Sequence, residues 1–311
     1  WSLSLSVGHF PVMCSESIDL LVPHIDSNGT YVDATFGRGG HAKRLLSVLG
    51  PNGKVIAIDK DIDAITEAKR LGIEDHRLVA CHGSFADIHI HLKTLGTMHV
   101  DGILMDLGVS SPQIDNSDRG FSFSSDGPLD MRMDQTGSMT AADWLNDASV
   151  EDITEVIKRY GEERYSKRIA HSIVNARPLK RTTDLVAAIK KGQVRGSRGK
   201  HDATRTFQAV RIKVNNELDD LEKGLLDGFN ALKISGRIVV IAFHSLEDRI
   251  VKRFFRTITQ NPPMPRRIPI QYEKFKIPAS VVSKVLRPTR EECERNPRAR
   301  SAVLRAVERR Q

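Results

Sequence analysis

The stretch Asp33-Ala34-Thr35-Phe36-Gly37-Arg38-Gly39-Gly40-His41 decides the fold. It continues the β-rich run that begins at Tyr31, and it leads into apolar residues at helical spacing from Ala42 to Leu49. A strand that turns on glycines into a helix lets the backbone bend tightly and lets a ligand lie against it. The stretch therefore predicts the first strand–helix unit of an α/β sheet domain, with a ligand site at the turn.

Further strands with the same apolar character follow along the chain. They are predicted at 54–59, 77–81, 100–106 and 237–243, with a final pair at 281–286 and 301–307. A helical pattern at 64–71 separates the second strand from the third. Continuous apolar strands separated by helices indicate a largely parallel sheet that is covered by helices on both faces. The predicted fold class is therefore α/β.

The middle of the chain interrupts this alternation, because no buried strand is recognisable between Asp115 and Asn215. Helical patterns instead run over 150–160 and 165–173, and a long apolar stripe extends from Phe207 to Leu232. We therefore predict a discontinuous sheet domain, residues 1–114 and 216–311, with an all-helical insertion at 115–215. The proline-rich stretch 261–278 is predicted to be an extended loop.

Positive charge is concentrated in two parts of the sequence. The formal net charge is +8, but residues 249–311 carry 17 Lys and Arg against 5 Asp and Glu. A second basic stretch, 190–213, has 8 Lys and Arg against a single Asp. Such clustering is expected of a protein that binds a polyphosphate, although a solvated basic face is the alternative.

The three cysteines, Cys14, Cys81 and Cys293, lie far apart and form no C-x-x-C pair. This spacing argues against a disulfide framework or a zinc site, and it favours a reducing cytoplasm. No apolar run approaches the length of a membrane span, so no membrane partner is expected. His89 and His91 alternate with isoleucines on a predicted helix and face different ways, so we predict no metal site.

The predicted ligand is an adenosine-containing cofactor. Asp59 ends the second strand, where a carboxylate can accept hydrogen bonds from both ribose hydroxyls. Gly37, Gly39 and Ala42 loosely fit the dinucleotide fingerprint, so a nicotinamide cofactor stays open on this motif alone. Asp33 argues against it, because an acid inside the loop would repel a pyrophosphate but would suit a cationic methionine group.

The exit of the fourth strand carries the run Asp106-Leu107-Gly108-Val109-Ser110-Ser111-Pro112-Gln113. Methylation of an aromatic amine needs acceptors near the amino hydrogens and a straight line from nitrogen through carbon to sulfur. Amino-methyltransferases place an acid or Ser followed by Pro at this position. We predict that Asp106, Ser111 and Pro112 position and polarise the target amine. The chain has no Pro-Cys pair, which argues against covalent catalysis at cytosine carbon five.

These motifs, with others along the chain, resemble the bacterial ribosomal-RNA small-subunit methyltransferase H family. The matching blocks occur in order from residue 8 to the C-terminal region: 8–13, 33–41, 106–113, 119–122, 127–134, 160–163, 204–209, Arg211, 214–218, 243–249 and 296–301. Departures from the family pattern are small: Phe10 and Cys14 in the first block, and a short, glycine-rich stretch at 190–201.

The resemblance implies a Rossmann-like class I methyltransferase domain with a helical insertion that recognises the substrate. It also implies S-adenosylmethionine as cofactor and methylation of the exocyclic N4 of a decoding-site cytidine in 16S rRNA, in the cytoplasm. The implied partner is the small ribosomal subunit, and a homodimer is left open beside a monomer.

The resemblance also implies roles for individual residues. The cofactor-binding set is Gly39, Gly40, His41, Asp59, Phe85, Asp106 and Gln113. Asp130, Arg132 and Asp134 are candidate substrate residues, although on their own they would indicate a turn. His244 and Ser245 look like parts of a hydrolase triad with Asp248, but no G-x-S-x-G elbow surrounds Ser245, so we expect them to close the pocket.

Two alternatives remain open from the sequence. One is a nicotinamide-dependent dehydrogenase, which binding of labelled cofactors would reveal. The other is a non-catalytic RNA-binding or ribosome-assembly factor, which would transfer no methyl group.

Overall fold

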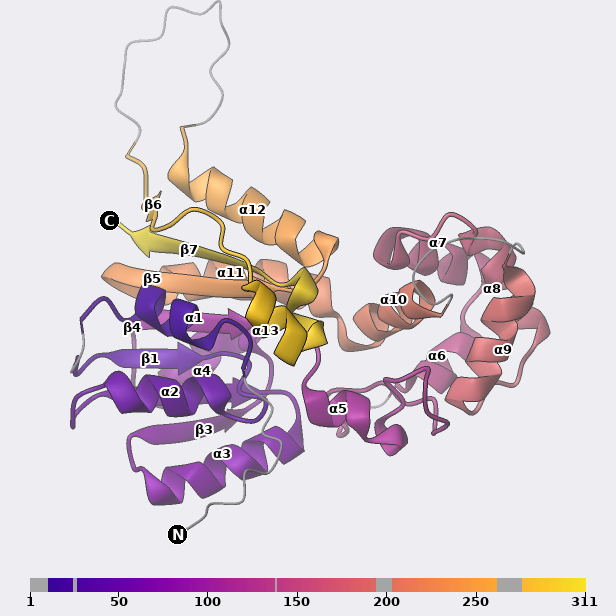
Figure 1. The fold of residues 1–311 in the computed structure, drawn as a ribbon, viewed down its shortest axis with the longest axis horizontal. Coiled ribbons are helices and arrows are strands. Elements are labelled where there is room, and N and C mark those ends of the chain that lie inside the picture. Colours follow the sequence, from indigo (N-terminus) through magenta and orange to yellow (C-terminus); the bar gives the residue numbers. More distant parts are fainter. Residues whose placement is uncertain (1–10, 25–26, 138, 194–202, 262–275) are drawn as a thin grey trace, which may run out of the picture. The chain divides into compact units, whose positions relative to one another are not determined.

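Seven strands form one mixed sheet in the computed structural model, which describes residues 11–24, 27–137, 139–193, 203–261 and 276–311 (Figure 1). The strands lie in the order β3-β2-β1-β4-β5-β7-β6. Their bounds are β1 Thr30–Asp33, β2 Lys54–Asp59, β3 Leu78–His82, β4 Val100–Asp106, β5 Leu232–Ala242, β6 Ala279–Val281 and β7 Val303–Arg309. Strands β1 to β5 pair in parallel, and β7 runs antiparallel to both β5 and β6.

Successive residues of the central strands enter two different cores, one on each face of the sheet. In β4, Leu104 belongs to the first core, whereas Ile103 and Met105 belong to the second. All three are fully buried, so each contributes about 1.5–3 kcal/mol of apolar burial. A strand that is apolar at every position is what a sheet covered on both faces requires.

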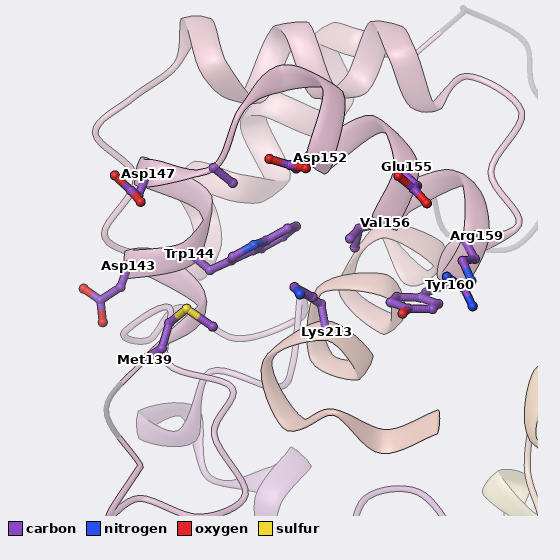
Figure 2. A pocket seen from close by; sticks show the side chains of 11 residues that line it. Met139, Asp143, Trp144, Asp147, Asp152, Glu155, Val156, Arg159, Tyr160 and Lys213 are labelled. Carbon is purple, nitrogen blue, oxygen red and sulfur yellow. The ribbon is translucent and has the colours of Figure 1, made fainter. Parts of the chain in front are cut away.

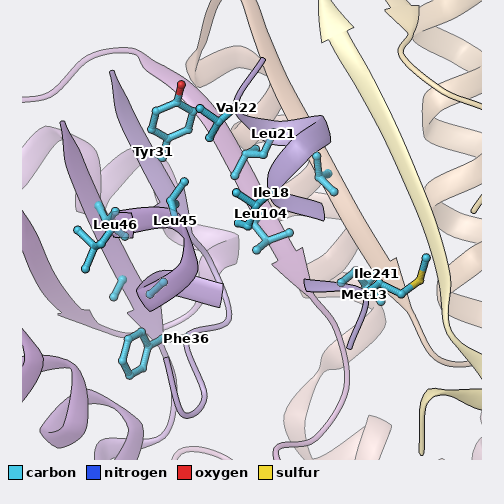
Figure 3. Close-up of a cluster of buried hydrophobic side chains, with 14 of the residues drawn as sticks. Met13, Ile18, Leu21, Val22, Tyr31, Phe36, Leu45, Leu46, Leu104 and Ile241 are labelled. Carbon is cyan, nitrogen blue, oxygen red and sulfur yellow. The ribbon is translucent and has the colours of Figure 1, made fainter. Parts of the chain in front are cut away.

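Helices cover both faces of this sheet. The helical elements of the sheet unit are α1 Cys14–Leu21, α2 Gly40–Val48, α3 Ile62–Glu74, η1 Phe85–Asp87, α4 Ile88–Thr94, α11 Glu217–Ala231, α12 Ser245–Thr259, α13 Arg290–Arg295 and η3 Pro297–Ser301. The first core receives side chains from α1, α2 and α3, and the second from α4, α11 and α12. Figure 3 shows Ile18 and Leu21 of α1 packed toward Leu104 of β4.

The predicted α/β class is confirmed, with strands at 54–59 and 100–106 where the apolar runs indicate them. One strand prediction is largely wrong. Of the predicted strand 281–286, only Val281 belongs to β6, and Leu286 makes an isolated bridge to Leu304. Helix α1 was not predicted, because its apolar positions are few and its burial depends on β4 and β5.

The second compact unit is Val109–Glu217 and is built around its own core. Its elements are α5 Ser111–Asp115, η2 Ser117–Arg119, α6 Ala141–Asp147, α7 Val150–Gly161, α8 Ser166–Asn175, α9 Thr182–Gly192 and α10 Thr204–Asn215. The described residues of this unit contain no strand, only an isolated bridge between Pro128 and Arg181. Buried Trp144, Ile157, Ile169 and Phe207 come from four different helices of the unit.

The unit begins at Val109, six residues before the predicted boundary, and ends at Glu217. Ser111, Pro112 and Gln113 therefore belong to the helical unit rather than to the sheet unit. The apolar stripe predicted from Phe207 to Leu232 is divided into two helices. Asn216 adopts a left-handed conformation with φ 54° between α10 and α11, a conformation that Asn tolerates better than most residues.

Several predictions fall on residues outside the described ranges. They concern Gly8, His9 and Phe10 of the first family block, most of the basic stretch 190–201, and most of the proline-rich segment 261–278. In the described part of the chain, no helix is both long enough and apolar enough to cross a membrane.

Candidate active site

Three acids stand at the carboxyl ends of three neighbouring strands. Asp59 ends β2, Asp33 ends β1 and Asp106 ends β4, and these strands are adjacent in the order β2-β1-β4. Because the carboxyl ends of parallel strands share one edge of the sheet, the three carboxylates gather there. This is the edge at which open α/β sheets bind their ligands.

The glycine turn after β1 is shaped by its backbone. Gly37 and Gly39 have φ of 53° and 72°, which favour glycine. A Cβ on Gly39 would lie 2.6 Å from the Phe36 ring, so no side chain fits there. Gly39 is also the N-cap of α2, and Gly40 begins the helix. The Gly39 N–H donates to Phe36 O at 2.8 Å, so the N–H groups of Gly40 and His41, at the start of the helix, are the ones placed to hold a carboxylate.

Asp59 ties this turn to the end of β2. Its Oδ2 accepts a hydrogen bond from Gly37 N–H at 2.7 Å, and its Oδ1 accepts one from Asp61 N–H at 2.9 Å. Lys60 N–H is a third backbone donor to this carboxylate, so about one of its four lone-pair sites remains for a ligand's hydroxyl. Burial raises the pKa of Asp59 to about 6, and the backbone hydrogen bonds from Asp61, Gly37 and Lys60 offset part of that effect.

Asp33 is 1% exposed, and its Oδ1 accepts a long hydrogen bond of 3.4 Å from Thr35 N–H. Its buried Oδ2 accepts no hydrogen bond from any residue that the structure describes. Burial raises the pKa of Asp33 to about 7, and the neighbouring charge of Asp59 adds to the increase. A buried acceptor without a donor is costly, so this oxygen fits a site that a cationic ligand fills.

Asp106 has the same property. Thr35 Oγ1 accepts a hydrogen bond from Asp106 N–H at 2.7 Å, which fixes the backbone at the end of β4. A quarter of the Asp106 side chain is exposed, yet its Oδ1 is buried and accepts no hydrogen bond within the described residues. Burial raises the pKa of Asp106 well above its usual range, and the charges of Asp33 and Glu247 raise it further.

His41 lies beside Asp106 and is almost fully buried. Its Nε2 lies 3.1 Å from Val12 O, and because a carbonyl can only accept, Nε2 carries the hydrogen of the neutral ring. Burial lowers the pKa of His41 to about 4, so the ring is neutral at neutral pH. Nδ1 then presents a lone pair to Asp106 Oδ2 at 3.6 Å. This separation is longer than a hydrogen bond, so a proton on Asp106 would reach the nitrogen only after the two side chains approach by several tenths of an ångström.

Phe85, in η1, is partly buried and packs against the second core. A Cβ on Gly224 of α11 would lie 2.5 Å from its ring, so the ring fills the space that this glycine leaves. The structure therefore gives Phe85 a packing role. The sequence did not single out Asp220 of α11, which accepts a hydrogen bond from Ser84 Oγ at 2.7 Å and pairs with Lys60 at 2.5 Å.

The residues predicted at the exit of β4 form a helix start. Ser110 N–H donates to Gln113 Oε1 at 2.9 Å, and the two residues make a capping box for α5. Gln113 is 4% exposed, and Ser111 and Pro112 open the helix. These residues therefore have a capping role in the helical unit.

Asp130, Arg132 and Asp134 lie together in the helical unit. Arg132 binds Asp130 through two hydrogen bonds of 2.8 Å, and this contact raises the pKa of Arg132. Asp134 Oδ1 accepts hydrogen bonds from Thr136 N–H and Thr136 Oγ1 at 2.9 and 2.6 Å, as in a local turn. Locally, then, they form an ion pair and a turn.

His244 and Ser245 begin α12 and do not form a triad. His244 is the N-cap, and Glu247 Oε2 accepts hydrogen bonds from the N–H groups of Phe243 and His244 at 2.8 and 3.2 Å. Asp248 is held instead by Arg305 of β7 at 2.8 Å. Glu247 is 3% exposed and was not among the residues predicted from the sequence. An acid three residues after a helix N-cap is typical of a capping box, and this spacing could have indicated its role.

The strand order, with β7 reversed between β5 and β6, and the acids around a glycine turn define a class I S-adenosylmethionine-dependent methyltransferase. The chain belongs to the MraW methylase family, whose profile matches residues 6–310. It is 48% identical over 305 residues to the ribosomal RNA small subunit methyltransferase H of Coxiella burnetii strain Dugway 5J108-111, covering 97% of this chain and 98% of the relative. The protein of the same name from Neisseria meningitidis serogroup B strain MC58 is 48% identical over 308 residues, covering 98% and 93%. The dehydrogenase alternative is therefore wrong.

Solved structures resemble this one more weakly. An rRNA methylase structure described as putative, from Clostridium thermocellum, has a TM-score of 0.46 at 10% identity and covers 98% of this chain and 99% of its own. A methyltransferase described as putative from Streptococcus mutans, solved in complex with SAH, has a TM-score of 0.45 at 12% identity, covering 97% and 99%. The sheet order by itself defines the fold.

Proposed function

We propose that this chain methylates the exocyclic N4 of a decoding-site cytidine in 16S rRNA, with the small ribosomal subunit as its substrate in the cytoplasm. The family membership and the name shared by its 48%-identical relatives support the rRNA substrate. The observation that carries the chemistry is the pair of buried carboxylate oxygens, Asp33 Oδ2 and Asp106 Oδ1, that lack donors at the sheet edge.

The sheet edge fits S-adenosylmethionine, which supplies an electrophilic methyl group when bound. Backbone N–H groups at Gly40 and His41 would hold the carboxylate of its methionine part, because they open α2, and Gly39 would let the cofactor approach the backbone, because it has no side chain. Asp59 would hold the ribose with the lone-pair site that its backbone donors leave. The unsatisfied oxygen of Asp33 would lie near the positive charges of the cofactor.

Phe85 would line the adenine region, and Gln113 would complete the cofactor-binding set. The observed packing of Phe85 and the capping box of Gln113 are compatible with these roles, since each fixes the side chain in place. Asp130, Arg132, Asp134, His244 and Ser245 are proposed to line the substrate pocket. The helical unit is proposed to recognise the RNA.

Asp106 is the proposed acceptor for the target amine. The lone pair of an aromatic amine is delocalised, so a hydrogen bond from the N4 amino group to Asp106 makes the nitrogen a better nucleophile. The bound cofactor would supply the methyl group to this nitrogen, and Asp106 would accept the proton that the N4 amino group loses. His41 Nδ1 lies 3.6 Å from this carboxylate and would accept a hydrogen bond from its protonated form once the two side chains approach. Ser111 and Pro112 are proposed to position the base.

The test uses small subunits from a strain that lacks this methylase. We expect incubation with the protein and methyl-labelled cofactor to place one methyl group on a decoding-site cytidine, located by mass mapping of nuclease fragments. A methyl group on another base, or on carbon five of cytosine, would refute the proposed target. RNA binding without methyl transfer would instead favour an assembly factor.

A further inference from the structure

Helices α8 and α9 of the helical unit pack at unusually close range. A Cβ on Gly192, the last residue of α9, would lie 2.7 Å from the Cα of Ile169 in α8. Ser172 Oγ of α8 also donates a hydrogen bond to Ala188 O of α9 at 2.7 Å. Both contacts lie within one compact unit, so the surface that the two helices form together is well defined.

A groove of about 420 Å³ lies along this pair of helices. Arg168, His171, Ser172 and Asn175 of α8 line one side, and Lys191 of α9 lines the other. Among the residues that the structure describes, no acid lines the groove. Arg168 and Lys191 are both exposed, and neither has an ion-pair partner in the part of the chain that the structure describes. The groove therefore offers two free cations beside a hydroxyl, an amide and an imidazole.

A second pocket in the same unit has the opposite character. This pocket has a volume of about 730 Å³ and is lined by residues of α6, α7 and α10. Figure 2 shows its lining side chains. Its acidic lining residues are Asp143, Asp147, Asp152 and Glu155. Only Arg159 and Lys213 oppose them among its charged residues. A phosphate would be repelled there and attracted to the groove between α8 and α9.

We propose that the groove between α8 and α9 binds backbone phosphates of the RNA substrate. This inference rests on the proposed function and deepens it, since it identifies the surface of the helical unit that meets the RNA. The Arg168 guanidinium presents a fork of donors that matches two phosphate oxygens, and Lys191 supplies a mobile point charge. Asn175 supplies a neutral amide donor. Such contacts fix position and affinity and carry no base specificity.

The test compares two double variants that remove the same charge. Arg168→Gln/Lys191→Gln removes both positive charges from the groove. Arg159→Gln/Lys213→Gln removes one Arg and one Lys from the acidic pocket. Equilibrium binding to purified small-subunit rRNA is measured across a salt titration. Each single-strand phosphate contact contributes about 0.7 to the slope of log affinity against log salt, so the groove variant should lose about 1.4. The control variant should keep the slope of the unmodified protein.

At about 0.1 M salt we expect the groove variant to bind rRNA on the order of tenfold more weakly. Its KM for small subunits should rise similarly, whereas kcat at saturating subunits and the Kd for S-adenosylmethionine should not change. Equal slopes for the two double variants would overturn the proposal. So would a loss of kcat without a change in rRNA affinity.

The binding assay separates this inference from the proposed function. If the protein transfers no methyl group to the subunits but its rRNA affinity depends on Arg168 and Lys191, the function fails and the groove stands. If transfer occurs at the expected cytidine but both variants bind rRNA alike, the groove fails and the function stands.

Discussion

The carboxylates of the two units differ in how they are satisfied. At the sheet edge, burial raises the pKa of Asp33, Asp59 and Asp106, and two of the three have an oxygen without a donor. In the helical unit, hydrogen bonds lower the pKa of Asp126 and Asp143: Asp126 is held by Thr183 and Arg181, and Asp143 by Thr140.

This difference separates acids that serve a ligand from acids that serve the fold. A buried carboxylate without donors destabilises the folded chain, so it is retained where a ligand supplies what is missing. A carboxylate that caps a helix or closes a turn already has its donors. The same residue type therefore has different tasks in the two units.

The largest effect is expected at the unsatisfied acid closest to the chemistry. Asp106→Asn should lower kcat on the order of 10³-fold, because the amide cannot take the N4 proton. Its free energy of unfolding should not decrease, since the substitution removes a buried charge. Methyl transfer at saturating substrates and urea unfolding measure the two quantities. A variant that keeps full activity would place the acceptor elsewhere.

A second difference should appear in the pH dependence of stability. Because the pKa of Asp33 is raised to about 7 in the folded chain, the folded state binds a proton that the unfolded state has released. The contribution of Asp33 to the free energy of unfolding is therefore fully present below its pKa in the unfolded chain. It is lost as pH rises through its pKa in the folded chain. As pH rises from about 5 to about 8, ionisation of Asp33 should lower the free energy of unfolding of the cofactor-free protein by about 2–3 kcal/mol.

Asp33→Asn should abolish that part of the decrease, whereas Asp126→Asn in the helical unit should leave it in place. Urea unfolding at a series of pH values measures the slope. If Asp33→Asn and the unmodified protein lose stability in parallel, Asp33 is ionised in the folded chain and its burial is less complete than the structure indicates.

A smaller effect on kcat is expected when the Nδ1 lone pair of His41, which faces Asp106, is removed. His41→Gln can keep a donor toward Val12 but removes the Nδ1 acceptor, whereas His41→Asn keeps an acceptor near Nδ1. We expect His41→Gln to lower kcat about tenfold and to move the acidic limb of its pH profile to lower pH, because protonated Asp106 loses a partner. Asp33, Glu247 and Cys14 also act on or respond to the Asp106 charge and are unchanged in this comparison.

The matched control is His89→Gln on α4, whose ring pairs with Asp227 away from the three acids. It should leave the pH profile unchanged. Equal profiles for His41→Gln and His41→Asn would show that His41 acts on the fold alone, and measured cofactor affinity keeps a binding defect apart from a rate defect.

The smallest effect is expected in the helical unit. Asp143 and Thr140 form the capping box of α6, so Asp143→Ala should lower the free energy of unfolding by about 1 kcal/mol. Methyl transfer should be unaffected. A large loss of methyl transfer would show that the acids of this unit also take part in function. It would contradict the distinction between acids that serve a ligand and acids that serve the fold.

The sequence by itself determined the features whose cause is local. Apolar runs gave β2 and β4 their bounds, and the glycines of the turn at Gly37 and Gly39 are required by the backbone conformation at those positions. The family was also recognisable, because its motifs recur in order along the chain. Each of these signals is carried by neighbouring residues.

Only the tertiary structure decided which acids are unsatisfied. Asp33 and Asp106 stand 73 positions apart, each has one buried oxygen without a donor in the described structure, and the charge of Glu247 in α12 adds to the raised pKa of Asp106. The break at Asn216 and the neutral tautomer of His41, set by Val12, are likewise products of contacts between distant segments. Burial and hydrogen bonding depend on surroundings that the packed chain creates, and residue order does not specify them locally.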